Sequence, residues 1–163
     1  MRSDGAVLPD LAETTVLHRL LLVRSDELPD LAARWLASDL VDTESVRVLA
    51  GYDRRDAWAL EQLLADSVSE ANVDVPSDTG TVQGIAVDWV GSAWRQTQDT
   101  RWAVTTLAHL GETDPEFDLG LFIGLDDEWS GSWGRLDADL KQAAKQELAR
   151  LLHGDDHGAS STH

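Results

Sequence analysis

Hydrophobic residues recur along most of the chain at the three- and four-residue intervals of an amphipathic helix. No stretch shows the two-residue alternation of β-branched residues that a half-buried strand requires. The pattern therefore predicts an all-α protein, a compact orthogonal or irregular bundle of seven to eight helices. The clearest apolar set is Leu60, Leu63, Leu64, Val68 and Ala71.

Capping signals place several helix ends. Asp10 and Glu13 have capping-box spacing, which predicts a first helix that runs to about Arg24. A second helix is expected from Ser25 or Asp26, and a third should be capped by Asp42 or Thr43. Glycine is expected to end the third helix at Gly51 and the sixth at Gly111. Apart from the set that begins at Leu60, the apolar sets that predict the later helices begin at Val82, Ala103, Phe117 and Leu140.

Glycine and tryptophan positions indicate where helices pack. Gly84 and Gly91 lie two turns apart on one side of the expected fifth helix, where another backbone should approach closely. The chain has seven Trp, two Phe and one Tyr. Each indole is large and carries an N–H that needs a partner, so most are expected half-buried between helices. Those placed at the packing seams are Trp35, Trp58, Trp89 and Trp102.

Length and composition predict one domain. The 163 residues, 42% of them hydrophobic, suffice for a single core. The stretch 72–80, with Pro76, resembles a loop within a domain more than a boundary. We expect a single helical domain over residues 1–152 and a disordered tail over 153–163.

Charge is the strongest compositional feature. Thirty acids against 13 bases give a net charge of −17, and the stretches 56–94 and 111–134 contain no base. Such a surface disfavours binding to phosphate backbones. It fits either a solvated exterior that keeps the protein soluble or an acidic face that meets a basic partner. The excess of Arg over Lys and of Asp over Glu indicates a high-GC bacterium or a salt-adapted cell.

Cysteine and targeting signals are absent from the sequence. Without Cys there is no disulfide, thiolate nucleophile or Cys-based metal site. Residues 1–10 have no apolar signal core, and no apolar run approaches the ~20 residues that cross a bilayer. We expect a cytoplasmic protein that does not contact a membrane.

The preferred partner-binding patch lies in the segment 125–134. Its acidic helix end leads into a Ser-Gly-Ser-Trp-Gly turn, where tryptophan flanked by carboxylates could anchor a basic surface. A calcium loop is the competing interpretation, but the segment lacks the alternating ligands of an EF-hand. No metal or cofactor is therefore predicted. The patch consists of Asp126, Asp127, Glu128, Trp129 and Trp133.

A second segment, 45–58, resembles a helix-turn-helix. In a DNA-binding protein Arg54 and Arg55 would enter the major groove from the start of its second helix. Asp56, Glu61 and the base-free stretch beyond them oppose this interpretation. The alternative is a pair of packed helices whose arginines lie at the surface and pair with nearby acids.

No catalytic residue is predicted. The sequence has no Gly-x-Ser-x-Gly or equivalent nucleophile motif. His18 lies one residue off an apolar face, and His109 lies near a helix C-terminus, where the helix dipole favours a cation. The run 153–157 could bind a metal adventitiously, but a chain end lacks the neighbouring groups that orient metal ligands, so no metal site is predicted there.

Several short segments resemble small uncharacterised acidic helical proteins of actinobacteria. They are LAARWL (31–36), VLAG (48–51), RRDAW (54–58), LDDEW (125–129) and WG (133–134), and the resemblance spans residues 28–150. It implies no activity, cofactor or site.

These observations favour a non-catalytic cytosolic protein that binds a protein partner with a basic surface, as an immunity factor, an inhibitor or a regulatory adaptor would. Three alternatives stay open. They are an acidic nucleic-acid mimic that blocks a DNA-binding protein, a helix-turn-helix regulator, and an enzyme that lacks a sequence signature. The oligomeric state is not predicted.

Overall fold

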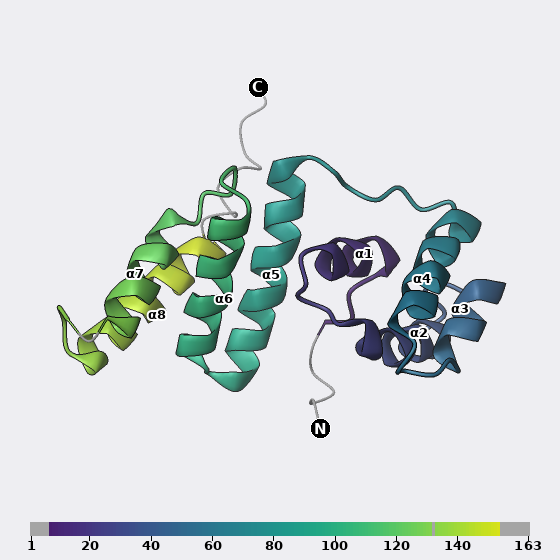
Figure 1. Cartoon of the computed structure of the whole chain (residues 1–163), viewed down its shortest axis with the longest axis horizontal. Coiled ribbons are helices and arrows are strands. Elements are labelled where there is room, and N and C mark those ends of the chain that lie inside the picture. The colour runs from purple at the N-terminus through teal and green to yellow at the C-terminus, as the bar shows by residue number, and fades with distance from the viewer. Residues whose placement is uncertain (1–6, 132, 154–163) are drawn as a thin grey trace. The chain divides into compact units, whose positions relative to one another are not determined.

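The computed structural model describes residues 7–131 and 133–153, which form eight α-helices and one 3-10 helix with no β-strand (Figure 1). The all-α prediction is confirmed. No helix in this described part is both long enough and apolar enough to cross a bilayer. In chain order the helices are α1 (Leu11–Arg19), η1 (Ser25–Glu27), α2 (Leu28–Ala37), α3 (Glu44–Ala50), α4 (Ala57–Ala71), α5 (Thr79–Thr97), α6 (Thr100–Thr113), α7 (Gly120–Ser130) and α8 (Asp137–His153).

The helices gather into two compact units. The N-terminal unit, Val7–Ala86, holds α1 to α4 with the first part of α5, and the C-terminal unit holds the described residues from Val87 onward. The boundary thus falls inside α5 and not in the loop at 72–80. A single domain over residues 1–152 stays a prediction.

The N-terminal unit is built around Trp35. This side chain is completely buried, and its indole Nε1 donates a hydrogen bond of 2.8 Å to the carbonyl of Pro9. Helix α3 packs against both α2 and α4. The apolar stripes found in the sequence supply the rest of this core, notably Leu17, Leu28, Val46, Leu49 and Leu60.

The C-terminal unit packs α6, α7 and α8 against one another. The rings of Trp89 on α5 and Trp102 on α6 meet with their centroids 6.2 Å apart and their planes tilted by 59°. Both indoles are half-buried, as the sequence predicted. The buried side chains of the three packed helices include Val104, Leu107, Phe122, Leu125, Leu140 and Leu148.

Trp58 corrects the prediction for tryptophans. It is 73% exposed, in the first turn of α4. Residues three and four positions apart share a helix face. Trp58 therefore shares its face with Glu61 and Gln62, which are exposed, while Leu60 and Leu64 are buried on the opposite side. The prediction that Trp58 lies at a packing seam between helices is therefore wrong.

Helix α1 ends at Arg19, five residues earlier than predicted. The Asp10–Glu13 capping box begins it as expected, but Leu21 takes a left-handed φ of 60°. The amides of Leu21 and Leu22 turn back to the carbonyls of His18 and Leu17, at 3.0 and 2.9 Å. These two hydrogen bonds form a Schellman motif, which normally has glycine at the left-handed position.

The same motif ends α2 and α4. Asp39 has φ 53° and Asn72 has φ 50°, and in each case the following amide bonds back by five residues, from Leu40 to Trp35 and from Val73 to Val68. The helix expected from Ser25 or Asp26 begins with η1 at Ser25 and continues as α2, and Thr43 caps α3 as expected.

The glycines behave differently from the prediction. Gly51 follows α3 but has φ −106°, outside the left-handed region. Gly111 lies inside α6, which continues to Thr113, so it does not close the helix. A Cβ there would lie 3.1 Å from the Cβ of Leu119, which indicates that the glycine serves helix packing.

Two further predictions need correction. Beyond the adjacent residues and backbone of α5, no atom in the described part of the chain lies within 4 Å of a Cβ placed on Gly84. The group that approaches Gly91 is the side chain of Leu152, not a backbone. Helix α8 extends to His153, the first residue of the predicted tail. Residues 154–163 lie outside the described residues.

Candidate partner-binding site at the end of α7

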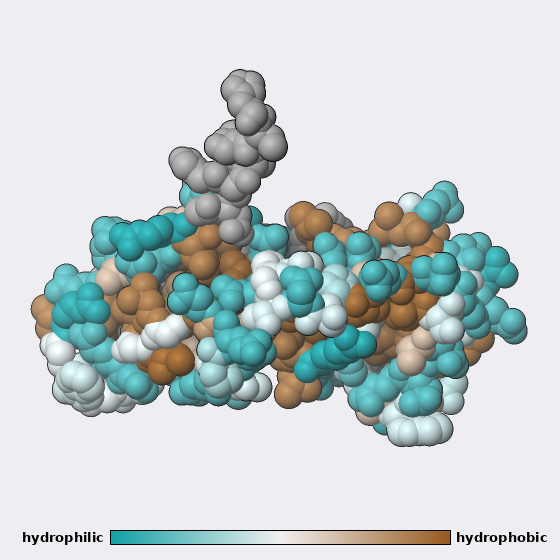
Figure 2. Space-filling view, turned by 90° about the horizontal axis from the view of Figure 1, so that it is seen from above, coloured by the Kyte–Doolittle hydropathy of each residue, from teal (hydrophilic) through white to brown (hydrophobic). Residues whose placement is uncertain are grey.

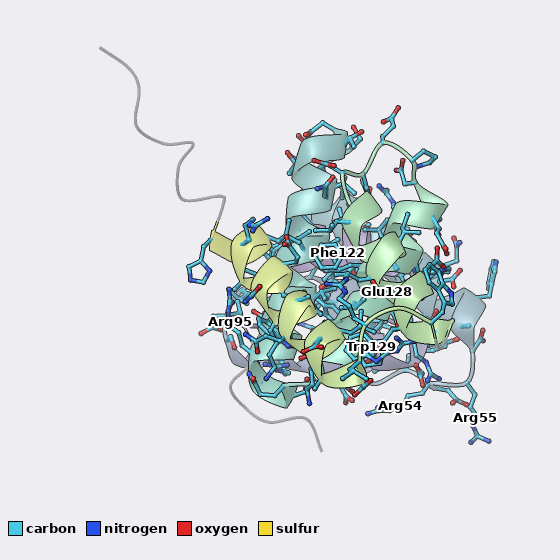
Figure 3. The ribbon with its side chains drawn as sticks, turned by 90° about the vertical axis from the view of Figure 1, so that its left-hand side faces the viewer. Arg54, Arg55, Arg95, Phe122, Glu128 and Trp129 are labelled. Atoms are coloured by element: carbon cyan, nitrogen blue, oxygen red, sulfur yellow. The ribbon has the colours of Figure 1, made fainter. Side chains whose placement is uncertain are left out.

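The predicted patch lies on the last turn of α7 and in the turn that leads to α8. Phe122 and Leu125 are buried and hold α7 on the C-terminal unit, which leaves the last turn at the surface. Figure 3 shows Phe122, Glu128 and Trp129 along this helix. The five predicted residues have different environments.

Glu128 is bound by Arg135. Its Oε2 lies 2.7 Å from Arg135 Nη2, and its Oε1 accepts from Nε at 3.0 Å and from the Arg135 backbone amide at 2.9 Å. The side-chain hydrogen bonds from Arg135 lower the pKa of Glu128 to about 2, with the backbone hydrogen bond as the next cause. Charge-assisted pairs of this bidentate kind are strong and directional. Glu128 therefore fastens the start of α8 to the end of α7.

Trp129 is engaged by Arg101 of α6. The guanidinium carbon of Arg101 lies 4.9 Å from the centroid of the Trp129 ring, which is the geometry of a cation–π interaction. Arg101 Nη2 also donates to Ser130 Oγ at 2.8 Å and lies 3.6 Å from Asp126 Oδ1. The indole Nε1 donates to Asp137 Oδ1. Both Trp129 and Asp126 are half-buried.

Trp133 is directed to solvent and is 67% exposed. A Cβ added to Gly131 would overlap the Nε1 edge of this indole, so the ring lies where a side chain at position 131 would be. Gly134 has φ 98°, and a Cβ there would lie 2.6 Å from Glu128 Oε1. The turn thus requires both glycines, one for the indole and one for its backbone conformation.

Asp127 is the remaining member of the patch. Its side chain is exposed, and its carbonyl accepts the Gly131 amide at 2.9 Å. Residues 127 and 131 lie one helical turn apart on the same face. Since the Trp133 ring occupies the side-chain position of residue 131, we infer that Asp127 and this ring share one face of the helix end. Asp127 and Trp133 are the exposed members of the patch, while Asp126, Glu128 and Trp129 are held by their own chain.

Arg54 and Arg55 precede α4, whose N-cap is Asp56. Arg54 binds Asp30 with both terminal nitrogens, at 2.8 and 2.6 Å, and this pairing lowers the pKa of Asp30. The Arg55 side chain is 93% exposed, lies 3.5 Å from Asp53 and extends away from the ribbon (Figure 3). The two arginines therefore lie in the loop and not on the helix itself. Their pairing with acids is the alternative that the sequence left open.

Sequence reasoning missed a cleft of about 440 Å³ in the N-terminal unit. His18 Nε2 lies 3.1 Å from Ser25 Oγ, which in turn donates to Glu61 Oε1 at 3.1 Å. This series of hydrogen bonds connects α1, η1 and α4. The lining also includes Leu21, Val23, Arg24, Asp26, Arg54 and Ala57.

Within the described residues, no group of three His, Asp or Glu side chains is arranged to hold a metal ion. Comparisons of this chain with protein-family profiles, with curated proteins and with solved structures found no match.

Proposed function

We propose that this chain is a non-catalytic cytosolic protein that binds a basic protein partner through the turn between α7 and α8, in the manner of an immunity factor, an inhibitor or a regulatory adaptor. The observations that carry the proposal are the exposed indole of Trp133 over Gly131 and the exposed side chain of Asp127 one helical turn before that glycine. Tryptophan is among the residues that contribute most to protein interfaces, because it buries a large area on contact.

The structure of the turn favours binding. The Glu128–Arg135 hydrogen bonds and the Trp129–Asp137 hydrogen bond link the end of α7 to Arg135 and to the first residue of α8. A surface that is ordered before it meets its partner loses less conformational entropy on binding. Because Glu128 and Asp126 are already paired, Trp133 could be buried without leaving them unsatisfied, and Asp127 could pair with the partner.

Charge supports a basic partner. Residues 7–86 carry 15 acids and six arginines, and residues 87–153 carry 12 acids and six bases. Figure 2 shows hydrophilic residues spread over one face of the molecule with hydrophobic residues between them. Complementary charge raises the rate of association and helps to exclude acidic partners.

The experiment compares three baits in lysate of the source cells: wild type, Trp133→Ala and Trp58→Ala. Captured proteins are identified by mass spectrometry, and a candidate is then purified so that its dissociation constant for each bait can be measured. Trp58 is the matched control, since it is 73% exposed but belongs to the N-terminal unit.

We expect a basic protein that binds wild type and Trp58→Ala equally and binds Trp133→Ala at least tenfold more weakly, as for an interface hot spot. Equal binding by all three baits would refute the role of the turn. A partner displaced by duplex DNA would favour the nucleic-acid mimic. Weaker binding by Trp58→Ala alone would move the interface to the N-terminal unit.

A further inference from the structure

We propose that the partner's anchoring residue is an arginine, whose guanidinium stacks on the indole of Trp133 and pairs with Asp127. This inference rests on the proposed function, because it assigns the chemistry of the residue that the turn between α7 and α8 receives. It follows from a comparison of two tryptophan–aspartate pairs at the same helix end.

The first pair is filled by the chain itself. Arg101 stacks on Trp129 with 4.9 Å between its guanidinium carbon and the ring centroid, and its Nη2 lies 3.6 Å from Asp126 Oδ1. One guanidinium thus uses its flat face for the aromatic ring and its edge for a carboxylate. Through this arrangement Arg101 of α6 holds the last turn of α7.

The second pair is open. Trp133 is 67% exposed over Gly131, and Asp127 is exposed one helical turn before that glycine. No base occurs between residues 111 and 134, and the Arg135 side chain binds Glu128. Trp133 and Asp127 therefore offer the same two groups as Trp129 and Asp126, an aromatic face and a carboxylate, without a cation from this part of the chain.

Arginine fits these two groups better than lysine. Its guanidinium is planar, stacks on aromatic rings and donates along its edge, whereas the lysine ammonium is a compact and strongly hydrated point charge. Arginine is also enriched with tryptophan among the residues that dominate interface energies. The surrounding negative charge attracts both cations, whereas stacking on the ring favours arginine.

The test titrates the ¹⁵N-labelled full chain with nonameric peptides of arginine, of lysine and of uncharged citrulline. The seven indole N–H resonances report on individual tryptophans, and loss of one signal in Trp133→Ala assigns Trp133. We expect the arginine peptide to shift the Trp133 resonance and to bind on the order of fivefold more tightly than the lysine peptide. Citrulline should not bind measurably.

The variants separate the ring from general charge attraction. In Trp133→Ala the preference for arginine over lysine should disappear, while Trp133→Phe, which keeps a ring, should retain part of it. Asp127→Asn should weaken arginine binding by about threefold, as expected for one exposed ion pair. Trp58→Ala is the control and should bind like wild type.

An arginine preference that survives Trp133→Ala, or equal affinities for the arginine and lysine peptides, would overturn the inference. The proposed function has a separate outcome. If the lysate partner depends on Trp133 while the peptides show no preference, the anchor is another residue and the function stands. If the peptides show the preference while no partner depends on Trp133, the arginine site stands and the proposed function fails.

Discussion

Alanine substitutions at Gly84 and Gly91, two of the three glycines of α5, test how closely other side chains approach this helix. Gly84 and Gly91 occupy equivalent positions two turns apart in α5, Thr79–Thr97. Alanine inside a helix is favoured over glycine by about 1 kcal/mol. Since no described atom beyond the adjacent residues and backbone of α5 lies within 4 Å of a Cβ at position 84, Gly84→Ala should gain nearly all of this free energy.

Gly91→Ala should behave in the opposite way. Its Cβ would overlap Cδ2 of Leu152 and lie 3.0 Å from Cδ1, whereas unstrained carbon atoms stay at about 3.5–4.0 Å. Overpacking of this kind costs about 1–3 kcal/mol. Set against the helix gain, the free energy of unfolding should fall by up to about 2 kcal/mol, less if the end of the Leu152 side chain rotates away.

The assay is thermal unfolding followed by circular dichroism at 222 nm. A change of 1 kcal/mol shifts Tm by about 2–4 °C for a chain of this size, so Gly84→Ala should raise Tm by that amount. In a Leu152→Ala background the obstructing methyl groups are gone, and Gly91→Ala should then become stabilising. If Gly91→Ala stabilises the wild type as much as Gly84→Ala does, the close contact with Leu152 is refuted.

Two further predictions concern buried and paired groups. Trp35→Phe removes the donor to the Pro9 carbonyl and leaves unfilled volume, so it should lower the free energy of unfolding by about 2–4 kcal/mol in urea titrations. Trp58→Phe, at an exposed position, should change this free energy by less than about 0.5 kcal/mol. Equal effects of the two substitutions would contradict the buried position of Trp35. The pKa of Glu128 is lowered from 4.5 to about 2, so its pairing with Arg135 stabilises the fold above pH 4.5 and is lost as the pH falls through 2. The stability difference between wild type and Glu128→Gln should shrink over this range, and a difference independent of pH would refute the ion pair.

The helical pattern was predictable because it depends on local spacing. The stripe from Leu60 to Ala71 buries the face that the sequence indicated, and the Asp10–Glu13 capping box forms as expected. The ends of helices were less predictable, because glycine was taken as the stop signal. Leu21 and Asp39 take the left-handed position instead, and no local propensity favours a leucine there.

The candidate site shows a similar division. Its residues were found from composition, since acids and tryptophans gather in one segment. Which of them face solvent depends on partners distant in the sequence, such as Arg101 for Trp129. The hydrogen-bonded series of His18, Ser25 and Glu61 gave no signal, because its members lie on three separate elements that only tertiary packing brings together.

The excess of acids in both units has a kinetic consequence. Each unit carries net negative charge, so each attracts a polycation over a long range and raises the rate of first contact. Added salt, which shortens the Debye length from about 10 Å at 0.1 M to about 3 Å at 1 M, should slow capture far more than it speeds release.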